Sequence, residues 1–320
     1  MKVVVFEVEL LGSKEEDWQE LKNHPLVTSF KKHVNVSEKE ILEKAKDADL
    51  VITNCGTYRA ETLSALSSLK YLGLMTTGYN HVDLDLAHQN KVVVTNIPAY
   101  GTMSVAQHVM GLLLEICCKV GFYNEAVKRT YWQEEDRFMF RIGRQFELSG
   151  KTIGIFGLGN IGFALAKMAQ GFGMEVIAYS RYKNPAYENS SIEYVTKEEL
   201  FARSDVISLN ASLSEDNFKI INDENIEKMK PGVIILNAAR GEMIDEDALA
   251  RGIYSGKVYA AGLDTLSEEP PKPSNPLLGL PQCIITPHMA WSTQEAMKRI
   301  IQTAINNALA YLDGAPINMK

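Results

Sequence analysis

The sequence contains little cysteine, and this scarcity limits the chemistry open to it. Its 320 residues include only four cysteines, which are Cys55, Cys117, Cys118 and Cys283. They form no CxxC pair and no spacing typical of a metal site. We therefore expect reduced, mostly buried thiols, with no disulfide framework and no bound metal.

Long apolar runs and an excess of basic charge are also missing. No apolar run reaches membrane-spanning length, and Glu7 interrupts the short apolar start where a signal peptide needs an unbroken one. The net charge is −7 and the isoelectric point about 5.5. Together these features argue against nucleic acid or an anionic membrane as a partner and predict a cytoplasmic protein.

What the sequence does contain is a repeated alternation of strand and helix patterns. In the first hundred residues, short runs rich in Val, Ile and Leu predict strands at 3–8, 27–34, 50–53, 71–75 and 92–97. The polar segments 38–48 and 60–67 between them have helical spacing. Such alternation indicates βαβ units and a parallel sheet. The chain is long enough for two domains of this class.

The middle of the chain interrupts the alternation. Ile97-Pro98-Ala99-Tyr100-Gly101 is a breaker cluster suited to a hinge, and Ser104 to Gln107 fits a capping box that opens a long apolar helix to about Lys128. Residues 131–146 are charged, irregular and rich in aromatic side chains. Because a plain surface loop would expose that apolar area, we expect the segment 101–146 to pack in a homodimer.

A second alternating series begins at Lys151. It predicts strands at 152–156, 175–179, 205–209, 233–236, 258–263 and 283–285, and a second capping box at Ser292 opens a helix to about Leu312. Between the first strand and its helix lies Gly157-Leu158-Gly159-Asn160-Ile161-Gly162, which fits G-x-G-x-x-G. In this strand–turn–helix context the pattern is typical of a dinucleotide site: Gly157 permits the turn, Gly159 admits the pyrophosphate, and Gly162 allows close packing of helix on strand.

The residues that select between NAD and NADP follow the next strand. An NAD enzyme usually has Asp or Glu there, whereas this chain has Ser180 and Arg181 after Tyr179. No carboxylate repels a 2′-phosphate, and Arg181 is able to pair with one. We predict that NADP is preferred; in the alternative, Arg181 only covers the adenine and NAD binds.

Three polar residues follow strands of the second series. Arg240 follows the strand at 233–236, Asp264 ends the one at 258–263, and His288 follows the one at 283–285. Ligands of open parallel sheets bind beyond the carboxyl ends of the strands, so these side chains are predicted to converge on one crevice.

These segments together resemble the D-2-hydroxyacid dehydrogenase family. Residues 261–270 (AGLDTLSEEP) resemble its Asp-then-Glu-Pro signature, residues 286–291 (TPHMAW) its histidine signature, and residues 76–83 and 104–108 two further blocks. The resemblance runs from about residue 75 to 293. It implies an α/β fold of two domains: a flavodoxin-like substrate domain at 1–99 and 288–320, and a doubly wound Rossmann domain at 100–287.

The resemblance also implies roles for individual residues. Arg240, Glu269 and His288 form its catalytic set, in which Arg240 holds the carboxylate of a 2-keto acid, His288 supplies a proton and Glu269 supports His288. The choice of Glu269 over Glu268 depends on the resemblance alone. Asp264 is the implied partner of the nicotinamide carboxamide. The further cofactor contacts that it implies are Thr77, Asn160, Ile161, Ala211, Ala238, Ala239, His288 and Ala290. Substrate contacts are expected at Thr77, Gly78, Arg240, His288 and Trp291, whereas His81, His88 and His108 are interpreted as structural.

Trp291 is the best indication of the substrate. Family members that resemble glycerate dehydrogenases and hydroxypyruvate or glyoxylate reductases often have His-x-Ala-Trp here. An indole wall favours a short substrate, and its N–H is able to serve a hydroxyl; simple packing at the start of the helix is the alternative. We also expect the extra domain of longer phosphoglycerate dehydrogenases to be missing. A dinucleotide-sensing corepressor-like protein of the same fold, or a dehydrogenase for another 2-hydroxy acid, remains an alternative function.

Overall fold

The structure is a computed structural model that describes residues 1–135, 138–141, 143–187 and 191–320. It divides into two compact units, Met1–Tyr100 with Ser292–Lys320, and Gly101–Trp291. The break at Tyr100 falls within the breaker cluster. At the other boundary, residues 288–291 belong to the second unit, whereas the sequence places the change before His288.

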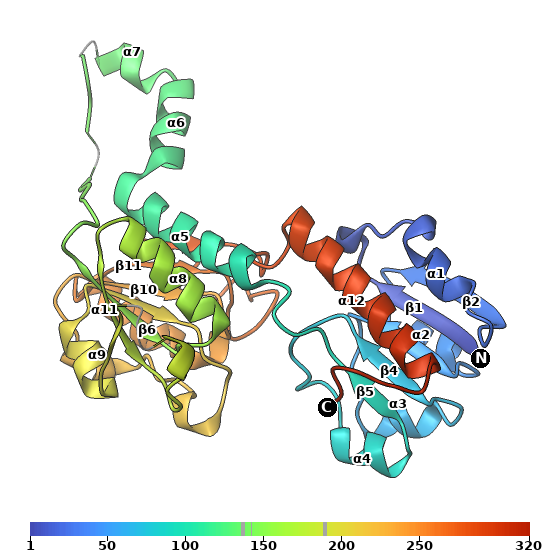
Figure 1. Cartoon of the computed structure of the whole chain (residues 1–320). Coiled ribbons are helices and arrows are strands. Elements are labelled where there is room, and N and C mark those ends of the chain that lie inside the picture. Colours follow the sequence, from blue (N-terminus) through green and yellow to red (C-terminus); the bar gives the residue numbers. More distant parts are fainter. Residues whose placement is uncertain (136–137, 142, 188–190) are drawn as a thin grey trace. The chain divides into compact units, whose positions relative to one another are not determined.

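The first unit is built on a parallel sheet of five strands in the order β2-β1-β3-β4-β5. This is the strand order of flavodoxin-like folds, as predicted. The strands shown in Figure 1 are β1 (Lys2–Glu7), β2 (Ser29–Val34), β3 (Leu50–Thr53), β4 (Tyr71–Leu74) and β5 (Val93–Thr95).

Helices cover both faces of this sheet, which explains why its inner strands β1, β3 and β4 consist mainly of continuous apolar runs. The helices are α1 (Gln19–Lys22), α2 (Glu38–Ala45), α3 (Ala60–Ala65), α4 (Leu84–Gln89) and α12 (Gln294–Leu312). Val4 and Phe6 of β1 face Ile41 of α2 and Leu63 of α3 in one core. On β4, Tyr71 packs against Tyr311 of α12, with ring centroids 4.8 Å apart.

The second unit contains a parallel sheet of seven strands in the order β12-β11-β10-β9-β6-β7-β8. Numbered from its own first strand, this is the 3-2-1-4-5-6 order of dinucleotide-binding sheets with one strand added at the β12 edge. The predicted fold class is confirmed. The strands are β6 (Thr152–Phe156), β7 (Glu175–Tyr179), β8 (Glu193–Tyr194), β9 (Val206–Leu209), β10 (Val233–Asn237), β11 (Val258–Leu263) and β12 (Cys283–Ile285).

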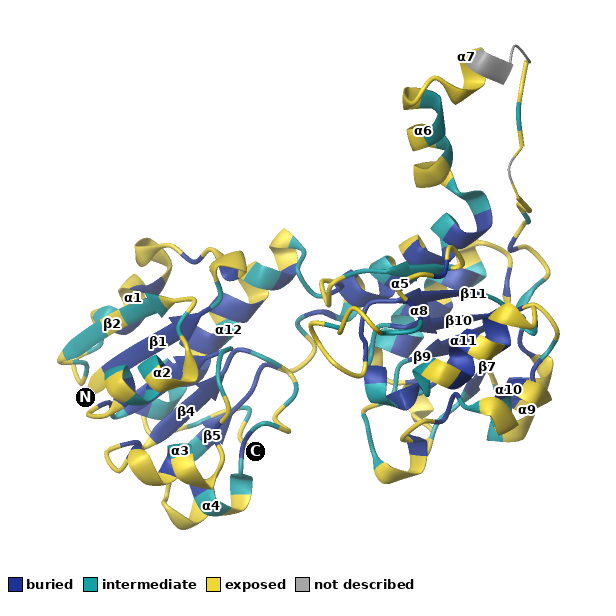
Figure 2. Cartoon of the chain, turned by 180° about the vertical axis from the view of Figure 1, so that it is seen from behind, coloured by how far each residue is buried: buried dark blue, intermediate teal, exposed yellow. Residues whose placement is uncertain are grey.

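Both faces of this sheet are also buried, as Figure 2 shows. One core joins it to α5 and α8, and the other to α9, α10 and α11. The helices are α5 (Thr102–Cys118), α6 (Val120–Lys128), α7 (Tyr131–Glu135), α8 (Asn160–Gly171), α9 (Lys197–Arg203), α10 (Asp223–Lys228) and α11 (Glu246–Tyr254).

Two predicted capping boxes are wrong in detail. The N-cap of α5 is Gly101, without a side-chain cap, and the hydroxyl of Ser104 donates instead to the carbonyl of Ala290. The predicted long helix also stops at Cys118, because Lys119 adopts a left-handed φ of 55° and α6 starts anew. In α12 the cap is Thr293 rather than Ser292, since the Thr293 side chain accepts from the N–H of Ala296.

Helices α6 and α7 extend away from the rest of the second unit (Figure 1). No residue of α6 is buried, and the exposed fractions of Val120, Phe122 and Phe138 are 66%, 48% and 89%. Phe140 packs on Tyr131, with centroids 5.1 Å apart. Part of the predicted aromatic segment, residues 136–137 and 142, lies outside the described residues. Within the described residues no single helix is long and apolar enough to cross a membrane. Only taken together, with a bend of 58° between them, do α5 and α6 have the length and composition of a membrane span.

Candidate active site

The three predicted strand-end residues lie at one edge of the second sheet. β10, β11 and β12 are neighbours and run parallel, so their carboxyl ends meet at the same edge. Arg240 follows β10, Asp264 follows β11 and His288 follows β12. Glu269 lies in the loop that leaves β11.

His288 and Glu269 form a hydrogen-bonded pair. Nδ1 of His288 lies 2.7 Å from Oε2 of Glu269, and Oε1 of Glu269 accepts from the N–H of Leu266 at 3.0 Å. The bond to Glu269 raises the pKa of His288 against the opposing effect of burial, and the charges of Glu269 and Asp264 add to the rise. Burial alone would raise the pKa of Glu269, but the bonds from His288 and Leu266 outweigh it and lower that pKa. The pair therefore favours a protonated imidazole beside a carboxylate.

Because the carboxylate carries no hydrogen, Nδ1 of His288 is the donor in this pair. The other ring nitrogen, Nε2, is then the position from which a proton can be delivered to a substrate. The exposed fractions of the His288 and Glu269 side chains are 44% and 38%. The pair is therefore open to a small molecule in the isolated unit.

The turn that carries Arg240 is fixed by the buried Asn237. The Asn237 side chain donates to the carbonyl of Arg240 at 2.8 Å and accepts from the N–H of Ala239 at 2.9 Å. Gly241 then presses against the next loop, since a Cβ there would lie 1.9 Å from the carbonyl carbon of Leu266. The guanidinium of Arg240 donates to the carbonyl of Ala239 at 2.6 Å, and its charge acts to lower the pKa values of both Glu269 and His288.

Asp264 anchors the loop that carries His288. Its side chain is 1% exposed, and its carboxylate accepts from the hydroxyl of Thr286 at 2.6 Å and from the N–H groups of Met289 and Ala290 at 3.0 and 2.8 Å. The Asp264 carbonyl accepts from the N–H of His288 at 2.9 Å. These bonds support the left-handed φ of 50° at His288, a conformation that disfavours residues other than glycine. The contact of Asp264 with a carboxamide stays a prediction.

The glycine-rich turn has the geometry expected of a pyrophosphate site. Gly157 has a φ of +98°, and a Cβ there would lie 2.6 Å from the backbone nitrogen of Ala211, while a Cβ on Gly162 would lie 2.3 Å from the carbonyl oxygen of Gly157. At Gly159 a Cβ would meet nothing within 4 Å. Gly159 is the N-cap of α8 and supplies no side-chain cap. The first N–H groups of α8, at Asn160 and Ile161, thus face a position where an anion is favoured, and the residues fit a dinucleotide.

Arg181 has a partner that the sequence did not reveal. Its guanidinium forms an ion pair with Asp216, which lies in the segment after β9. Both side chains are exposed, at 60% and 74%. A carboxylate therefore lies beside the position predicted to favour a 2′-phosphate, although it belongs to another loop.

The predicted role of the Trp291 N–H needs correction. The indole N–H donates to the carbonyl of His288 at 2.9 Å, so it has a partner within the chain rather than a substrate hydroxyl. The bond also holds the ring against the loop that carries His288. Trp291 as a wall of the substrate site stays a prediction.

The predicted contacts Thr77 and Gly78 belong to the first unit. The hydroxyl of Thr77 donates to the carbonyl of Ile97 at 2.8 Å, and its own carbonyl accepts from the side chain of Asn96 at 2.7 Å. These bonds fix the loop after β4 to the end of β5. The substrate and cofactor roles of both residues stay predictions.

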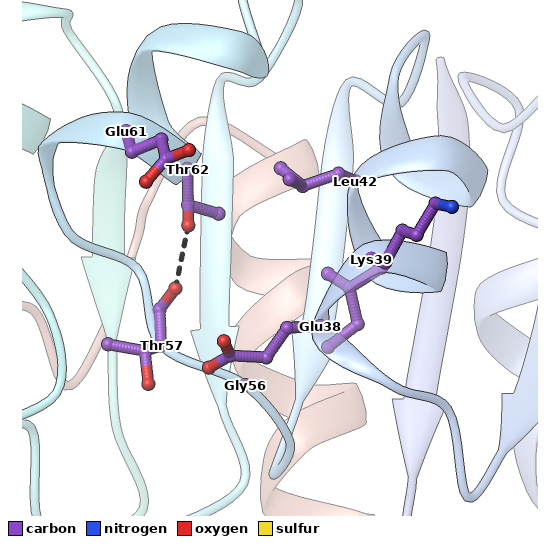
Figure 3. Close-up of a pocket in the computed structure, with 8 residues that line it drawn as sticks. Glu38, Lys39, Leu42, Gly56, Thr57, Glu61 and Thr62 are labelled. Atoms are coloured by element: carbon purple, nitrogen blue, oxygen red, sulfur yellow. Dashed lines mark hydrogen bonds between the residues drawn. The ribbon is translucent and has the colours of Figure 1, made fainter.

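Each unit contains a hollow whose lining includes none of Arg240, Asp264 and His288. In the second unit a space of about 530 Å³ lies beside Asn160, Phe163 and Tyr187, and the rings of Phe163 and Tyr187 stack 4.0 Å apart. In the first unit a space of about 270 Å³ lies between α2 and α3 (Figure 3), where Thr62 donates to the carbonyl of Thr57 at 2.9 Å. None of the residues lining the hollow in the first unit is a predicted site residue.

Comparison with known proteins decides the family. Residues 110–290 match the family model of the D-isomer specific 2-hydroxyacid dehydrogenases, NAD binding domain. This protein belongs to that family. Its membership confirms the predicted resemblance and the predicted oxidoreductase, and it establishes a nicotinamide dinucleotide as the cofactor.

The relatives of this D-2-hydroxyacid dehydrogenase match it over most or all of its length. It is 43% identical over 319 residues to a hydroxypyruvate reductase of Blautia hydrogenotrophica, covering 100% of this chain and 99% of that protein. It is 33% identical to a glycerate dehydrogenase of Methylorubrum extorquens, covering 88% of each. Among solved structures, an acyclic imino acid reductase in complex with NADPH and D-Arg is 28% identical, with a TM-score of 0.88 over 100% of both chains.

Several residues that contact the candidate site residues of this dehydrogenase were not predicted to matter. Asn237 and Thr286 occur in segments that were recognised, but their bonds are visible only in three dimensions. His108 was interpreted as structural, yet its Nε2 lies 2.9 Å from the hydroxyl of Thr286. Nothing in the sequence signals the pairing of Asp216 with Arg181.

Proposed function

We propose that this dehydrogenase reduces hydroxypyruvate or glyoxylate to D-glycerate or glycolate. The observation that carries the proposal is the His288–Glu269 pair, 2.7 Å apart, with Arg240 on the neighbouring loop. A cation that binds a carboxylate and an imidazole that supplies a proton are the two groups that reduction of a 2-keto acid requires of a protein.

In the proposed reaction Arg240 binds the substrate carboxylate. Its planar guanidinium is able to make two parallel hydrogen bonds, which hold the carboxylate and thereby orient the adjacent ketone. Nε2 of His288 then donates a proton to the ketone oxygen, while Glu269 holds the ring through Nδ1 and stabilises its charged form. The bound cofactor supplies the hydride.

The cofactor is proposed to bind at the carboxyl ends of β6 and β7. Gly157, Gly159 and Gly162 leave room for the pyrophosphate, with Asn160 and Ile161 at the start of α8. Ala211 lies against Gly157, and Ala238, Ala239 and Ala290 belong to the loops at the ends of β10 and β12. Asp264 and Thr77 complete the proposed set of cofactor contacts.

NADP is the proposed preference over NAD. Neither of the two residues directly after β7, Ser180 and Arg181, is a carboxylate, and the ion pair of Arg181 with Asp216 is exposed. Exposed ion pairs contribute little free energy, about 0–1 kcal/mol, so a doubly charged phosphate is able to compete for the guanidinium. Asp216 nevertheless reduces the advantage that Arg181 alone would give.

The proposed substrates are short for two reasons. The hydroxypyruvate reductase relative is identical at 43% of positions along the full chain. Trp291 is in addition held beside the catalytic loop by its bond to His288, where its bulky ring limits the space for a side chain.

The dehydrogenase is further proposed to form a homodimer through the segment 101–146. Val120, Phe122, Trp132 and Phe138 expose large apolar area along it. An exposed apolar surface of this kind is typical of a protein–protein contact, and the partner we propose is a second copy of the chain.

The experiment that tests the function is a substrate panel. Hydroxypyruvate, glyoxylate, pyruvate and a branched 2-keto acid are each supplied with NADH and with NADPH, and oxidation of the cofactor is followed by absorbance. We expect the highest kcat/KM with hydroxypyruvate or glyoxylate, and loss of turnover with retained cofactor binding in His288→Gln. Tight cofactor binding without turnover of any acid would contradict the proposal and favour the corepressor-like alternative.

A further inference from the structure

The face of α5 that carries Ser104 and His108 contacts the loop of the catalytic histidine at two points. The hydroxyl of Ser104 donates to the carbonyl of Ala290 at 2.5 Å, and Nε2 of His108 lies 2.9 Å from the hydroxyl oxygen of Thr286. Residues four apart on a helix lie on the same face, one turn above the other. The two contacts therefore reach both ends of the loop 286–290, with His288 between them.

The direction of the bonds at the His108 end is determined by the chemistry of their partners. The carboxylate of Asp264 has no hydrogen, so the Thr286 hydroxyl donates to it, at 2.6 Å. The same hydroxyl must then accept from His108, whose Nε2 carries the hydrogen. Nε2 of His108 also lies 3.5 Å from the Asp264 carboxylate, which is buried and binds two N–H groups of the loop. His108 thus completes a chain of hydrogen bonds that ends on the backbone beside His288.

The position of α5 makes this contact a fixed one. The helix packs against β10 and β11, and Val105, Val109 and Leu112 on it are buried in the core of the unit. Ser104 itself is 5% exposed, and its hydroxyl is too buried for water to replace Ala290 easily as its acceptor. The backbone at His288, with its left-handed φ of 50°, is consequently held between β11 and a rigid helix.

We propose that Ser104 and His108 are positioning residues that hold His288 in place for proton transfer. The inference rests on the proposed catalytic role of His288. It gives a function to the segment 104–108 other than helix capping. It also replaces the interpretation of His108 as a structural residue only.

The reason to expect an effect on catalysis is the geometry of the pair. Three charged groups act on the pKa of His288: Glu269, which is hydrogen-bonded to it, and Asp264 raise this pKa, and Arg240 lowers it. If the loop 286–290 loses an anchor, the bond between His288 and Glu269 lengthens for part of the time. Proton transfer then slows because the donor is misplaced. The imidazole also loses part of the interaction that favours its charged form.

The experiment compares Ser104→Ala and His108→Leu with the wild type. Each is expected to lower kcat about 5- to 50-fold, because a misplacement of about 1 Å is able to reduce a rate about 100-fold. The fall of kcat/KM at high pH is expected to move to lower pH. His108→Gln, which keeps an N–H donor, is expected to recover most of the lost rate. Nuclear magnetic resonance of the six histidines gives the pKa of His288 without turnover, and the same downward shift is expected there.

Ser204→Ala is the matched control. Ser204 is fully buried in the same unit and donates to the carbonyl of Leu200 at 2.6 Å, far along the chain from the catalytic loop. It should lower the Tm as Ser104→Ala does and leave kcat and the pH profile unchanged. If His108→Leu does not fold, Ser104→Ala and His108→Gln decide the question: a wild-type rate and pH profile for Ser104→Ala would overturn the proposal.

His288→Gln separates this inference from the proposed function. If His288→Gln retains turnover, the proposed function fails and this inference fails with it. If His288→Gln is inactive while Ser104→Ala and His108→Leu keep the wild-type kcat and pH profile, only the positioning role is wrong.

Discussion

Arg181 and Asp216 are separated by 35 residues in the chain, yet their side chains form an ion pair at the end of β7. An anion is already present where a 2′-phosphate is proposed to bind. In the cofactor selection that we propose, that carboxylate and the phosphate compete for one guanidinium.

The first prediction concerns this competition. Asp216→Asn should increase the ratio of kcat/KM with NADPH to that with NADH, because Arg181 no longer has a competing partner. Ser180→Asp combined with Arg181→Ala should reverse the preference, since it restores repulsion and removes attraction; the change is expected to be about 10-fold or more, from the free energy of a charge-assisted hydrogen bond. Steady-state kinetics with both cofactors measures the ratio. A wild type that prefers NADH and is insensitive to Asp216→Asn would show that Arg181 does not bind the cofactor.

The second prediction tests Arg240 as the carboxylate anchor. Arg240→Lys keeps the charge but loses the planar pair of donors, so kcat/KM for the keto acid should fall about 10- to 100-fold. The control is Arg251→Lys, since Arg251 makes a similar two-bond pair with Asp223 on the surface. It should leave the kinetics unchanged. Near-wild-type kinetics in Arg240→Lys would rule out the role.

The third prediction concerns pH. Because the pKa of His288 is raised, the protonated donor persists to a higher pH than in a free imidazole, and kcat/KM for reduction falls only above that pKa. Glu269→Gln removes the bond and the charge that raise the pKa, so the fall should occur at lower pH. Glu268→Gln is the matched control, because Glu268 pairs with Lys272 at 2.8 Å instead. Identical pH profiles for the wild type and Glu269→Gln would disprove the coupling.

The fourth prediction concerns assembly. Light scattering at micromolar concentration should give about twice the 35.7 kDa of one chain. Phe122→Asp should shift the mass toward that of one chain, because a charge would be buried in the proposed contact. Tyr254→Asp is the control, since Tyr254 is 78% exposed on α11, away from the segment 101–146. A wild type with the mass of one chain would refute the dimer.

The sequence alone was sufficient for the fold class and for predicting that Arg240, Asp264 and His288 lie at one edge of the second sheet. Strands buried on both faces appear as continuous apolar runs, so Leu50–Thr53, Thr152–Phe156 and Val258–Leu263 were predicted with the bounds that the structure has. The turn Gly157–Gly162 was also predictable, because its glycine spacing follows from local backbone geometry: the positive φ of Gly157 and the close packing of Gly162. Arg240 and His288 were predicted to lie at one edge of the sheet because the carboxyl ends of neighbouring parallel strands lie at the same edge.

The tertiary structure decided what depends on contacts between distant segments. It placed Glu269 rather than its neighbour Glu268 on His288, although the two residues are chemically identical in the sequence. It paired Arg181 with Asp216, turned the indole N–H of Trp291 to the backbone, and directed Ser104 to Ala290 rather than to its own helix. A hydroxyl or a carboxylate is able to bond with any partner within reach, and only the packing of the elements determines which partner that is.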